Sequence, residues 1–368
     1  MKGSKNKRLI IFMPFIGIGG VEKNLYIISN FLSKKIKHLS ICTVSKDKKK
    51  NFNKNIKFIT PNFNVPEKLN IRLKYLICIF ILLKNIMRDK NCLLLSFQAN
   101  IYCILICKLF KIKVLIRSNS SPSGWYHNIF KKKIYQKIVS LADEVIVNSL
   151  EFKKEMEKKF KIKAKCIYNP LNVVTIKKKS QDKIRNNFFR KNYLNIINVG
   201  RLTEQKNQIL ILKAINSVKK EIKVKLLVIG RGIEYQKLKN YILDNNLSKI
   251  VKIQKPDSNP FKFINKSDLF ILSSNYEGLP NVLLEAAVLK KFIISSDCPT
   301  GPKEILKNGK YGYLFKVGDH NQLKTKILLF SKNRKNLKKK SENLNKSLNR
   351  FDEKNNLNFY LNLINKYI

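Results

Sequence analysis

Two glutamates lie close together in the stretch SSNYEGLPNVLLEAA, in a chain with only 24 acidic residues against 75 Lys and Arg. Seven residues separate Glu277 from Glu285, and Pro280 between them favours the first turn of a helix. Glu277 is then expected on the loop before this helix and Glu285 roughly one turn inside it. Carboxylates accept hydrogen bonds from hydroxyls, and amides at a helix start can hold an anion. The spacing therefore fits a ligand with hydroxyls at both ends and phosphates in the middle.

A second candidate binding segment, NVGRLTEQKN, follows an apolar run in the second half of the chain. Gly200 is expected at the end of a strand, with Arg201 next and Lys206 five residues later. Arg offers a planar fork of donors and Lys a compact charge, so the pair suits a diphosphate. In a chain so rich in lysine, this segment carries weight only together with the glutamates.

Glycines also follow the first strand-like run of the chain, in GIGG at residues 17–20. Backbone N–H groups at the start of the next helix favour a phosphate, although glycines at this place can also serve only to make a tight turn. A dinucleotide-binding fingerprint needs a further glycine at position 22, where Glu22 stands. The sequence therefore argues against a dinucleotide-dependent dehydrogenase.

Short apolar runs that alternate with helical patterns must position these segments. Runs such as KRLIIFMPF, CLLLSF and VKLLVIG are continuous in their apolar character, which predicts parallel strands covered on both faces by helices. We therefore predict an α/β chain of two doubly wound, Rossmann-like domains that face each other across a cleft, with ligands at the carboxyl ends of the strands. The predicted parts are an N-terminal domain (1–170), a linker (171–192), a C-terminal domain (193–345) and a C-terminal helix (346–368) that packs back on the N-terminal domain.

The net charge of +51 has two interpretations. Lys, Asn, Ile, Phe and Leu are abundant together, as codon bias in an AT-rich genome would produce. Alternatively, the chain is attracted to a polyanion such as nucleic acid, anionic lipid or a phosphorylated substrate. The first 110 residues contain four acids, so the N-terminal half is the expected contact face for an anionic partner.

Localisation is predicted from the N-terminus, the apolar runs and the seven cysteines. The start MKGSKNKRLIIFMPFIGIGG resembles a signal peptide but has no small-x-small cleavage site, and we interpret it as a first buried strand. No run reaches the roughly 18 apolar residues of a membrane span. The cysteines form no CxxC pair and are interpreted as small buried side chains in a reducing compartment. We expect a cytoplasmic protein, peripheral on the cytoplasmic face of the inner membrane.

Six segments in order carry a family resemblance over nearly the whole chain. EGLPNVLLEA resembles the E-x7-E segment of retaining glycosyltransferases of family 4 (group 1), which have the GT-B fold. The N-terminal glycine loop, the end of the strand before the linker, the diphosphate clasp and the segments after E-x7-E are also similar. They read GIGGVEKNL, IYNPL, VGRLTEQKN, SDCPTGPKEIL and GKYGYLF in this chain.

The resemblance implies roles for individual residues. Arg201, Lys206 and Glu277 would be catalytic: the two cations offset charge on the leaving diphosphate, and Glu277 binds hydroxyls of the transferred sugar. Glu285 would hold the ribose hydroxyls. Gly19 and Gly20 would let the acceptor domain approach the donor. The complete predicted donor set is Gly19, Gly20, Gly200, Arg201, Lys206, Gly278, Leu279, Pro280, Asn281, Val282 and Glu285.

Candidate acceptor residues lie in the segment IRSNSSPSGWYH. Many relatives carry a histidine in this loop of the acceptor domain, but here Arg117 and Asn119 occupy its start and His127 comes late. His127 is either an exposed loop histidine or a contact to acceptor or sugar, and Arg117 is a candidate for an acceptor phosphate. His38 and His320 are expected at the surface.

The predicted function is transfer of a sugar from a nucleoside diphosphate sugar, with a UDP-sugar favoured, to a glycan or lipid-linked acceptor. The product would serve cell-surface polysaccharide synthesis, such as lipopolysaccharide or capsule. No Asp-x-Asp occurs, so we expect no metal and no cofactor. An anionic membrane surface is an expected partner, and nucleic acid is not. The alternatives are a basic nucleic-acid-binding protein, which lacks a recognisable motif here, and an inactive relative that only binds a sugar nucleotide.

Overall fold

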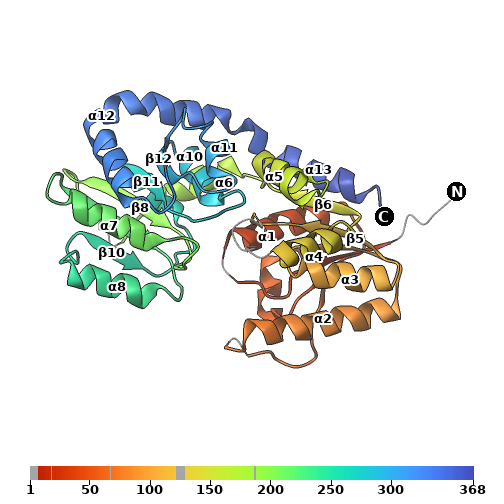
Figure 1. The fold of residues 1–368 in the computed structure, drawn as a ribbon. Coiled ribbons are helices and arrows are strands. Elements are labelled where there is room, and N and C mark those ends of the chain that lie inside the picture. The colour runs from red at the N-terminus through yellow and green to blue at the C-terminus, as the bar shows by residue number, and fades with distance from the viewer. Residues whose placement is uncertain (1–6, 18, 67, 122–128, 186–187) are drawn as a thin grey trace. The chain divides into compact units, whose positions relative to one another are not determined.

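A computed structural model describes residues 7–17, 19–66, 68–121, 129–185 and 188–368. The chain divides into two compact units, each built on its own parallel sheet (Figure 1). Unit 1 comprises residues 1–170 and 353–368, and unit 2 comprises residues 171–352. The predicted α/β class with two Rossmann-like sheets is thereby confirmed.

The sheet of unit 1 has seven parallel strands in the order β3-β2-β1-β4-β5-β6-β7. Leu9 of the interior strand β1 aligns with Leu39 of β2 on one side and Leu93 of β4 on the other. The strands are β1 (Arg8–Phe12), β2 (Leu39–Cys42), β3 (Lys57–Ile59), β4 (Cys92–Ser96), β5 (Lys113–Arg117), β6 (Glu144–Val147) and β7 (Lys165–Cys166). Residues 8–12, at the predicted first strand, are therefore a strand in the middle of a sheet.

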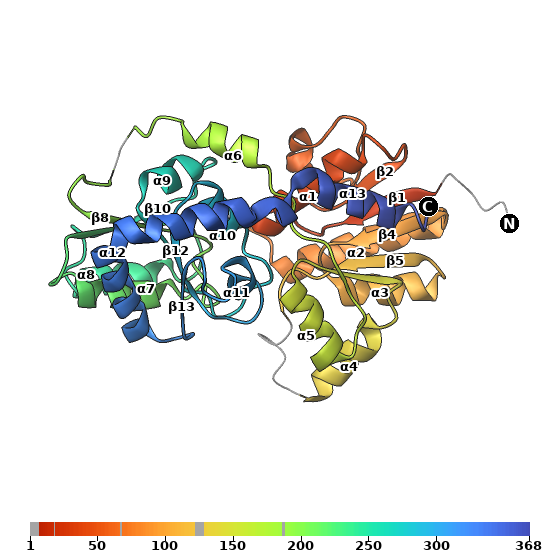
Figure 2. The ribbon, with the colours of Figure 1, turned by 90° about the horizontal axis from the view of Figure 1, so that it is seen from above.

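Helices cover both faces of this sheet because successive strand residues point to opposite sides. Ile10 and Phe12 of β1 pack with residues of α2, α3, α4 and α5, whereas Leu9 and Ile11 pack with α1 and α13. Figure 2 shows α13 beside α1, with which it is in contact. The helices are α1 (Gly20–Leu32), the 3₁₀ helix η1 (Lys46–Asn51), α2 (Ile71–Arg88), α3 (Asn100–Leu109), α4 (Ile129–Val139), α5 (Leu150–Phe160) and α13 (Glu353–Ile364).

Unit 2 repeats the plan with six parallel strands in the order β10-β9-β8-β11-β12-β13. Its largest core cluster joins apolar residues of these strands to α7, α8 and α12. The strands are β8 (Leu194–Val199), β9 (Val224–Ile229), β10 (Val251–Gln254), β11 (Leu269–Leu272), β12 (Phe292–Ser296) and β13 (Tyr313–Phe315). The helices are α6 (Val173–Ser180), α7 (Gln208–Val218), α8 (Tyr235–Asp244), α9 (Phe261–Lys266), α10 (Asn281–Val288), α11 (Pro302–Ile305), α12 (His320–Lys346) and the 3₁₀ helix η3 (Ser347–Phe351).

The segment predicted to be the interdomain linker, 171–192, contains a helix that its polar, unperiodic sequence did not indicate. The helix is α6, which the Asn172 side chain caps by accepting from the Thr175 N–H at 2.7 Å, and Ile176 of this helix is buried. Its C-terminal carbonyls accept hydrogen bonds from Asn259 and Asn265. These contacts attach the segment to unit 2, and the lysine-rich pattern hid Ile176, the buried apolar residue of α6.

The C-terminal helix was predicted over 346–368, and the structure divides this segment. The long helix α12 ends at Lys346, η3 follows in unit 2, and α13 belongs to unit 1. Where the chain passes between the units, Leu171 donates its N–H to Phe351 O at 3.0 Å. The two connecting segments therefore pair with each other. Among the described residues, no helix is long and apolar enough to cross a bilayer.

Candidate functional site

The predicted donor residues other than Gly19 and Gly20 lie in unit 2, in the segments that follow the carboxyl ends of β8 and β11. The turn after β8 starts at Gly200, and the turn after β9 starts at Gly230. A Cβ on Gly230 would stand 2.0 Å from Gly200 O, and a Cβ on Gly232 would stand 2.1 Å from Leu202 O. Because no side chain fits at these distances, the glycines allow the two turns to approach each other. The sequence did not single out Gly230 and Gly232 as packing residues of this edge.

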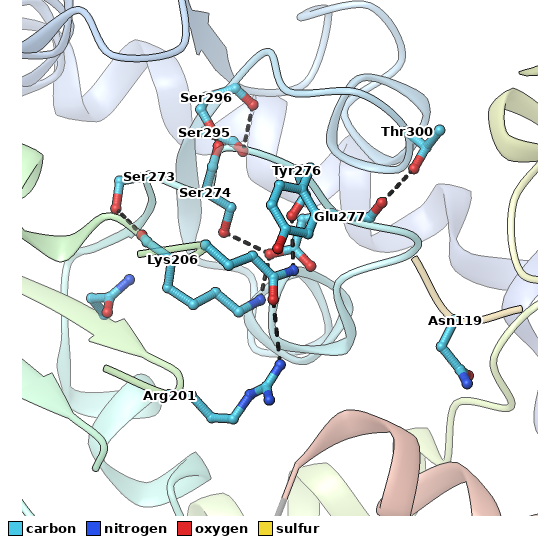
Figure 3. A network of polar contacts seen from close by, with 12 residues as sticks. Asn119, Arg201, Lys206, Ser273, Ser274, Tyr276, Glu277, Ser295, Ser296 and Thr300 are labelled. Atoms are coloured by element: carbon cyan, nitrogen blue, oxygen red, sulfur yellow. Dashed lines mark hydrogen bonds and ion pairs between the residues drawn. The ribbon is translucent and has the colours of Figure 1, made fainter. Parts of the chain in front are cut away.

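Lys206 and Glu277 form an ion pair at this edge (Figure 3). Their side chains are 16% and 7% exposed, so water screens the pair little. The Glu277 carboxylate also accepts a hydrogen bond from Ser274 Oγ at 2.6 Å, and Glu277 O accepts one from Thr300 Oγ1 at 2.7 Å. A buried carboxylate needs such partners to offset its desolvation. Glu277 therefore holds Lys206 in place in addition to any contact with a ligand.

Arg201 is exposed, in contrast to Lys206. Its Nη2 donates to Gln205 Oε1 at 3.3 Å, and Gln205 in turn donates to Tyr276 O at 2.9 Å (Figure 3). Gln208, at the start of α7, donates to Arg201 O at 2.8 Å and fixes the backbone of the turn. The site thus presents one cation fixed in a buried pair and one exposed guanidinium, an arrangement that can bind an anion from solvent.

The segment between the two glutamates forms the loop and the start of α10, as predicted. The helix begins at Asn281 after Pro280, without a side-chain cap, and Glu285 is its fifth residue. Gly278 and Leu279 lie in the loop, and Val282 lies in the first turn. Glu285 is 5% exposed, so it is a buried carboxylate inside the helix. The structure joins Glu277 to Lys206, a contact that the sequence did not indicate.

The loop after β12 supports the glutamate loop from a separate part of the sequence. A Cβ on Gly301, whose φ is +89°, would stand 2.3 Å from Gly278 O, and Ser296 Oγ donates to Ser274 O at 2.6 Å. Cys298 in this loop is buried; burial raises the pKa of its thiol, and the Glu277 carboxylate raises it further. Both effects favour the neutral thiol over the thiolate. The segment SDCPTGPKEIL contributed to the family resemblance, but the sequence predicted no role for its individual residues.

A carboxylate lies against the glycine turn of unit 1, for which phosphate binding was one of the two interpretations. Gly19 precedes α1 with an extended backbone, and Gly20 is the first residue of the helix. A Cβ on Gly19 would stand 2.8 Å from Glu22 Oε2, so the Glu22 carboxylate lies against the turn. A carboxylate at a helix start competes with an incoming anion. Ile18, inside this turn, lies outside the described residues.

Arg117 was predicted to face an acceptor, and the structure corrects this. The side chain has no exposed surface. Its Nε donates to the Tyr360 hydroxyl of α13 at 2.9 Å, and its Nη2 donates to Asn169 Oδ1 at 2.6 Å. Arg117 therefore anchors α13 to the end of β5. Asn119 is half-buried and donates to Phe97 O at 2.7 Å, and His127 lies outside the described residues.

Two units, each with its own parallel, helix-covered sheet, place this chain among GT-B-like folds. HepE of Anabaena, solved in complex with UDP-glucose, has this fold: it aligns with a TM-score of 0.77 at 15% identity, over 98% of this chain and 100% of its own. Residues 179–347 match the model of the family described as glycosyl transferases group 1. The chain is therefore similar to this family over most of unit 2, in agreement with the resemblance of its sequence segments.

Curated relatives match the chain over part of their length. An uncharacterized glycosyltransferase of Methanocaldococcus jannaschii is 37% identical over 58% of this chain and 59% of its own length. The second relative, from Campylobacter jejuni, is named N-acetylgalactosamine-N,N'-diacetylbacillosaminyl-diphospho-undecaprenol 4-alpha-N-acetylgalactosaminyltransferase. It is 27% identical over 60% of this chain and 62% of its own length. The alignments thus span about three fifths of each relative.

Proposed function

We propose that this chain transfers a sugar from a nucleoside diphosphate sugar, in the first place a UDP-sugar, to a lipid-linked glycan acceptor. The observation that carries the proposal is the Lys206–Glu277 pair beside the exposed Arg201 at the strand edge of unit 2. The UDP-glucose complex of HepE and the diphospho-undecaprenol in the name of the Campylobacter jejuni relative support the donor and acceptor classes. The product would enter cell-surface polysaccharide, made at the cytoplasmic face of the membrane.

The proposed chemistry follows from where charge develops. When the bond between the sugar and the phosphate breaks, the leaving diphosphate gains negative charge. Lys206 is already oriented by Glu277, so its ammonium stabilises that charge without reorganising in the transition state. Arg201 supplies a second set of donors, and its planar fork matches a phosphate. Glu277 and Glu285 accept from sugar and ribose hydroxyls, and configuration at the anomeric carbon is retained.

A ligand screen tests this proposal. The thermal unfolding midpoint would be measured with UDP, GDP, ADP, CDP or a short RNA, for the wild type, Arg201→Ala and Glu285→Gln. Lys213→Ala is the matched control, because Lys213 is an exposed cation on α7. We expect one nucleoside diphosphate to raise the midpoint in the wild type and the control and to have less effect in the two variants. The shift should persist with EDTA, since the proposed chemistry needs no metal.

Other outcomes separate the alternatives. A salt-sensitive shift with RNA alone, equal in all variants, would contradict the proposal and favour a polyanion-binding protein. A nucleotide shift without release of nucleoside diphosphate from any of a panel of UDP-sugars and lipid-linked acceptors would favour an inactive relative that only binds the donor.

A further inference from the structure

The outer surface of α2 is unusual for a helix that covers a sheet. Its inner side places Cys78, Leu82 and Ile86 in the core. On the opposite side, Leu73, Leu76, Phe80 and Met87 are exposed, Phe80 to 66%. Apolar residues on both sides of a helix normally mean that both sides are covered. Within the described chain, the outer side of α2 is open to solvent.

The same surface continues over α3 and α4. Helix α3 contacts both α2 and α4, and the three helices cover the same face of the sheet (Figures 1 and 2). Leu105 and Leu109 of α3 are exposed, the latter to 76%, and so are Phe130 and Ile134 of α4. We call the exposed residues of α2, α3 and α4 the outer face. It is an extended apolar surface, and such surfaces mark interaction sites.

The charges of the outer face have one sign. The sequences of α2, α3 and α4 contain no Asp or Glu. Arg72, Lys84 and Arg88 are exposed on α2, and Lys133 and Lys137 are exposed on α4. Lys108 of α3 is excluded from this set because it pairs with Asp143 at 3.1 Å. The outer face therefore combines exposed apolar side chains with unopposed cations.

Helix α5 of the same unit is the internal comparison. Its lysines alternate with glutamates, and Lys153 and Lys159 lie 3.7 Å from Glu157 and Glu155. That is the pattern of an ordinary solvated helix. Lysine abundance from codon bias would affect α5 and α2 alike. It does not by itself explain why three neighbouring helices combine exposed apolar side chains with a complete absence of acids.

We propose that the outer face docks on an anionic lipid bilayer, with its apolar side chains at the acyl boundary and its Lys and Arg at the phosphates. Amphipathic surfaces of this composition bind in the plane of a membrane. A second copy of the chain fits less well, because the same face would bring like charges together. Nucleic acid would bind the Lys and Arg side chains through its phosphates but would leave the exposed leucines in contact with water. The inference deepens the proposed function and rests on it for the lipid-linked acceptor.

Vesicle flotation of the full chain tests the inference. Vesicles of phosphatidylcholine alone would be compared with vesicles that also contain phosphatidylglycerol, at about 0.1 M and about 1 M salt. We expect binding only to the anionic vesicles, and weaker binding at high salt. Lys84→Gln/Arg88→Gln should weaken binding about thirtyfold, because each cation near the surface contributes about fivefold and the two factors multiply. Leu76→Gln/Phe80→Gln should weaken it at least about tenfold.

Matched controls change the same residue types outside the outer face. Lys335→Gln/Lys339→Gln removes two exposed cations of α12, and Leu243→Gln removes an exposed leucine of α8. Both should bind like the wild type. Absence of binding to anionic vesicles, equal binding to neutral vesicles, or equal losses in the controls would overturn the inference. So would a self-association that the α2 variants abolish, since the face would then bind a second copy.

The nucleotide response separates the two proposals. The α2 variants should keep the thermal shift with nucleoside diphosphate, which also shows that they fold. If the wild type binds anionic vesicles but shows no nucleotide shift, the membrane-docking inference stands and the proposed transferase function is contradicted. If it shows a nucleotide shift and sugar transfer but does not bind vesicles, only the docking inference is contradicted.

Discussion

Units 1 and 2 use the same parallel-sheet plan and differ in where their polar residues lie. In unit 2, polar and charged side chains gather at the strand ends, and Arg201 after β8 is exposed there. In unit 1, the arginine at the end of β5, Arg117, is fully buried against α13, and the exposed cations lie on the outer helices. The same residue type thus has different roles on the same architecture. The fold provides the positions, and burial and partners decide what each position does.

The largest effect is expected at the exposed arginine. Arg201→Ala should lower kcat about 100-fold, because a donor aimed at the developing charge is lost. The thermal unfolding midpoint should change little, since the side chain is exposed. Rate measurements with the UDP-sugar found active, beside Lys213→Ala, check this. A change in rate below about threefold, in a variant that folds, would mean that Arg201 does not stabilise the leaving group.

Backbone contact at the strand edge of unit 2 should be the next most sensitive feature. Gly230→Ala should destabilise the protein by about 3 kcal/mol or displace the turn, because its Cβ would overlap Gly200 O. Gly318→Ala is the control: its φ is +81°, but nothing lies within 4 Å of the added Cβ, so a cost of about 1 kcal/mol is expected. Urea unfolding measures both. Equal losses in the two variants would show that the close approach is unimportant.

The buried arginine of unit 1 gives a smaller effect on stability. Tyr360→Phe removes the hydroxyl that accepts from Arg117 Nε and leaves a buried donor without that partner. A loss of about 1–3 kcal/mol in the free energy of unfolding is expected. The nucleotide response of unit 2 should be unchanged. A variant as stable as the wild type would contradict the anchoring role of Arg117.

The smallest expected effect is at Asp143. Burial acts to raise the pKa of this carboxyl, but the Val114 N–H and the ammonium groups of Lys113 and Lys108 outweigh it, and the net pKa is lowered. Because the pKa is lowered in the folded state, the ionised carboxylate stabilises the protein at pH values above about 3.9, the usual pKa of Asp. This stabilisation is lost as the pH falls through the pKa of the folded state.

Asp143→Asn should therefore cost less than about 1 kcal/mol at neutral pH, and its difference from the wild type should shrink below about pH 4. Urea unfolding across this range measures the difference. A difference that grows as pH falls would contradict the assignment.

Local patterns in the sequence predicted most of the fold. The apolar run of each central strand, such as LIIF after Arg8, indicates a parallel strand buried on both faces. Pro280 gave the start of α10 to within one residue. Both signals depend on neighbours in the chain. The seven-residue spacing of Glu277 and Glu285 likewise placed one residue on a loop and the other in a helix.

Contacts between distant residues could not be predicted in this way. Lys206 and Glu277 are 71 residues apart, and Arg117 and Tyr360 are 243 apart. The sequence named Lys206 and Glu277 as separate ligand-binding residues and left Arg117 open to a ligand. The sequence also did not predict the helix α6, because one buried isoleucine among lysines produces no periodic signal.

By itself, the sequence determined two parallel-sheet units, the strand edge with its glycines and cations, and the loop and helix that carry the two glutamates. Only the tertiary structure decided which of these groups pair, which arginine is buried and which side of α2 is exposed. The run of α2 is apolar nearly all round, so its pattern cannot choose an inner face. Packing against the sheet makes that choice, because burial and pairing depend on surfaces that distant segments supply.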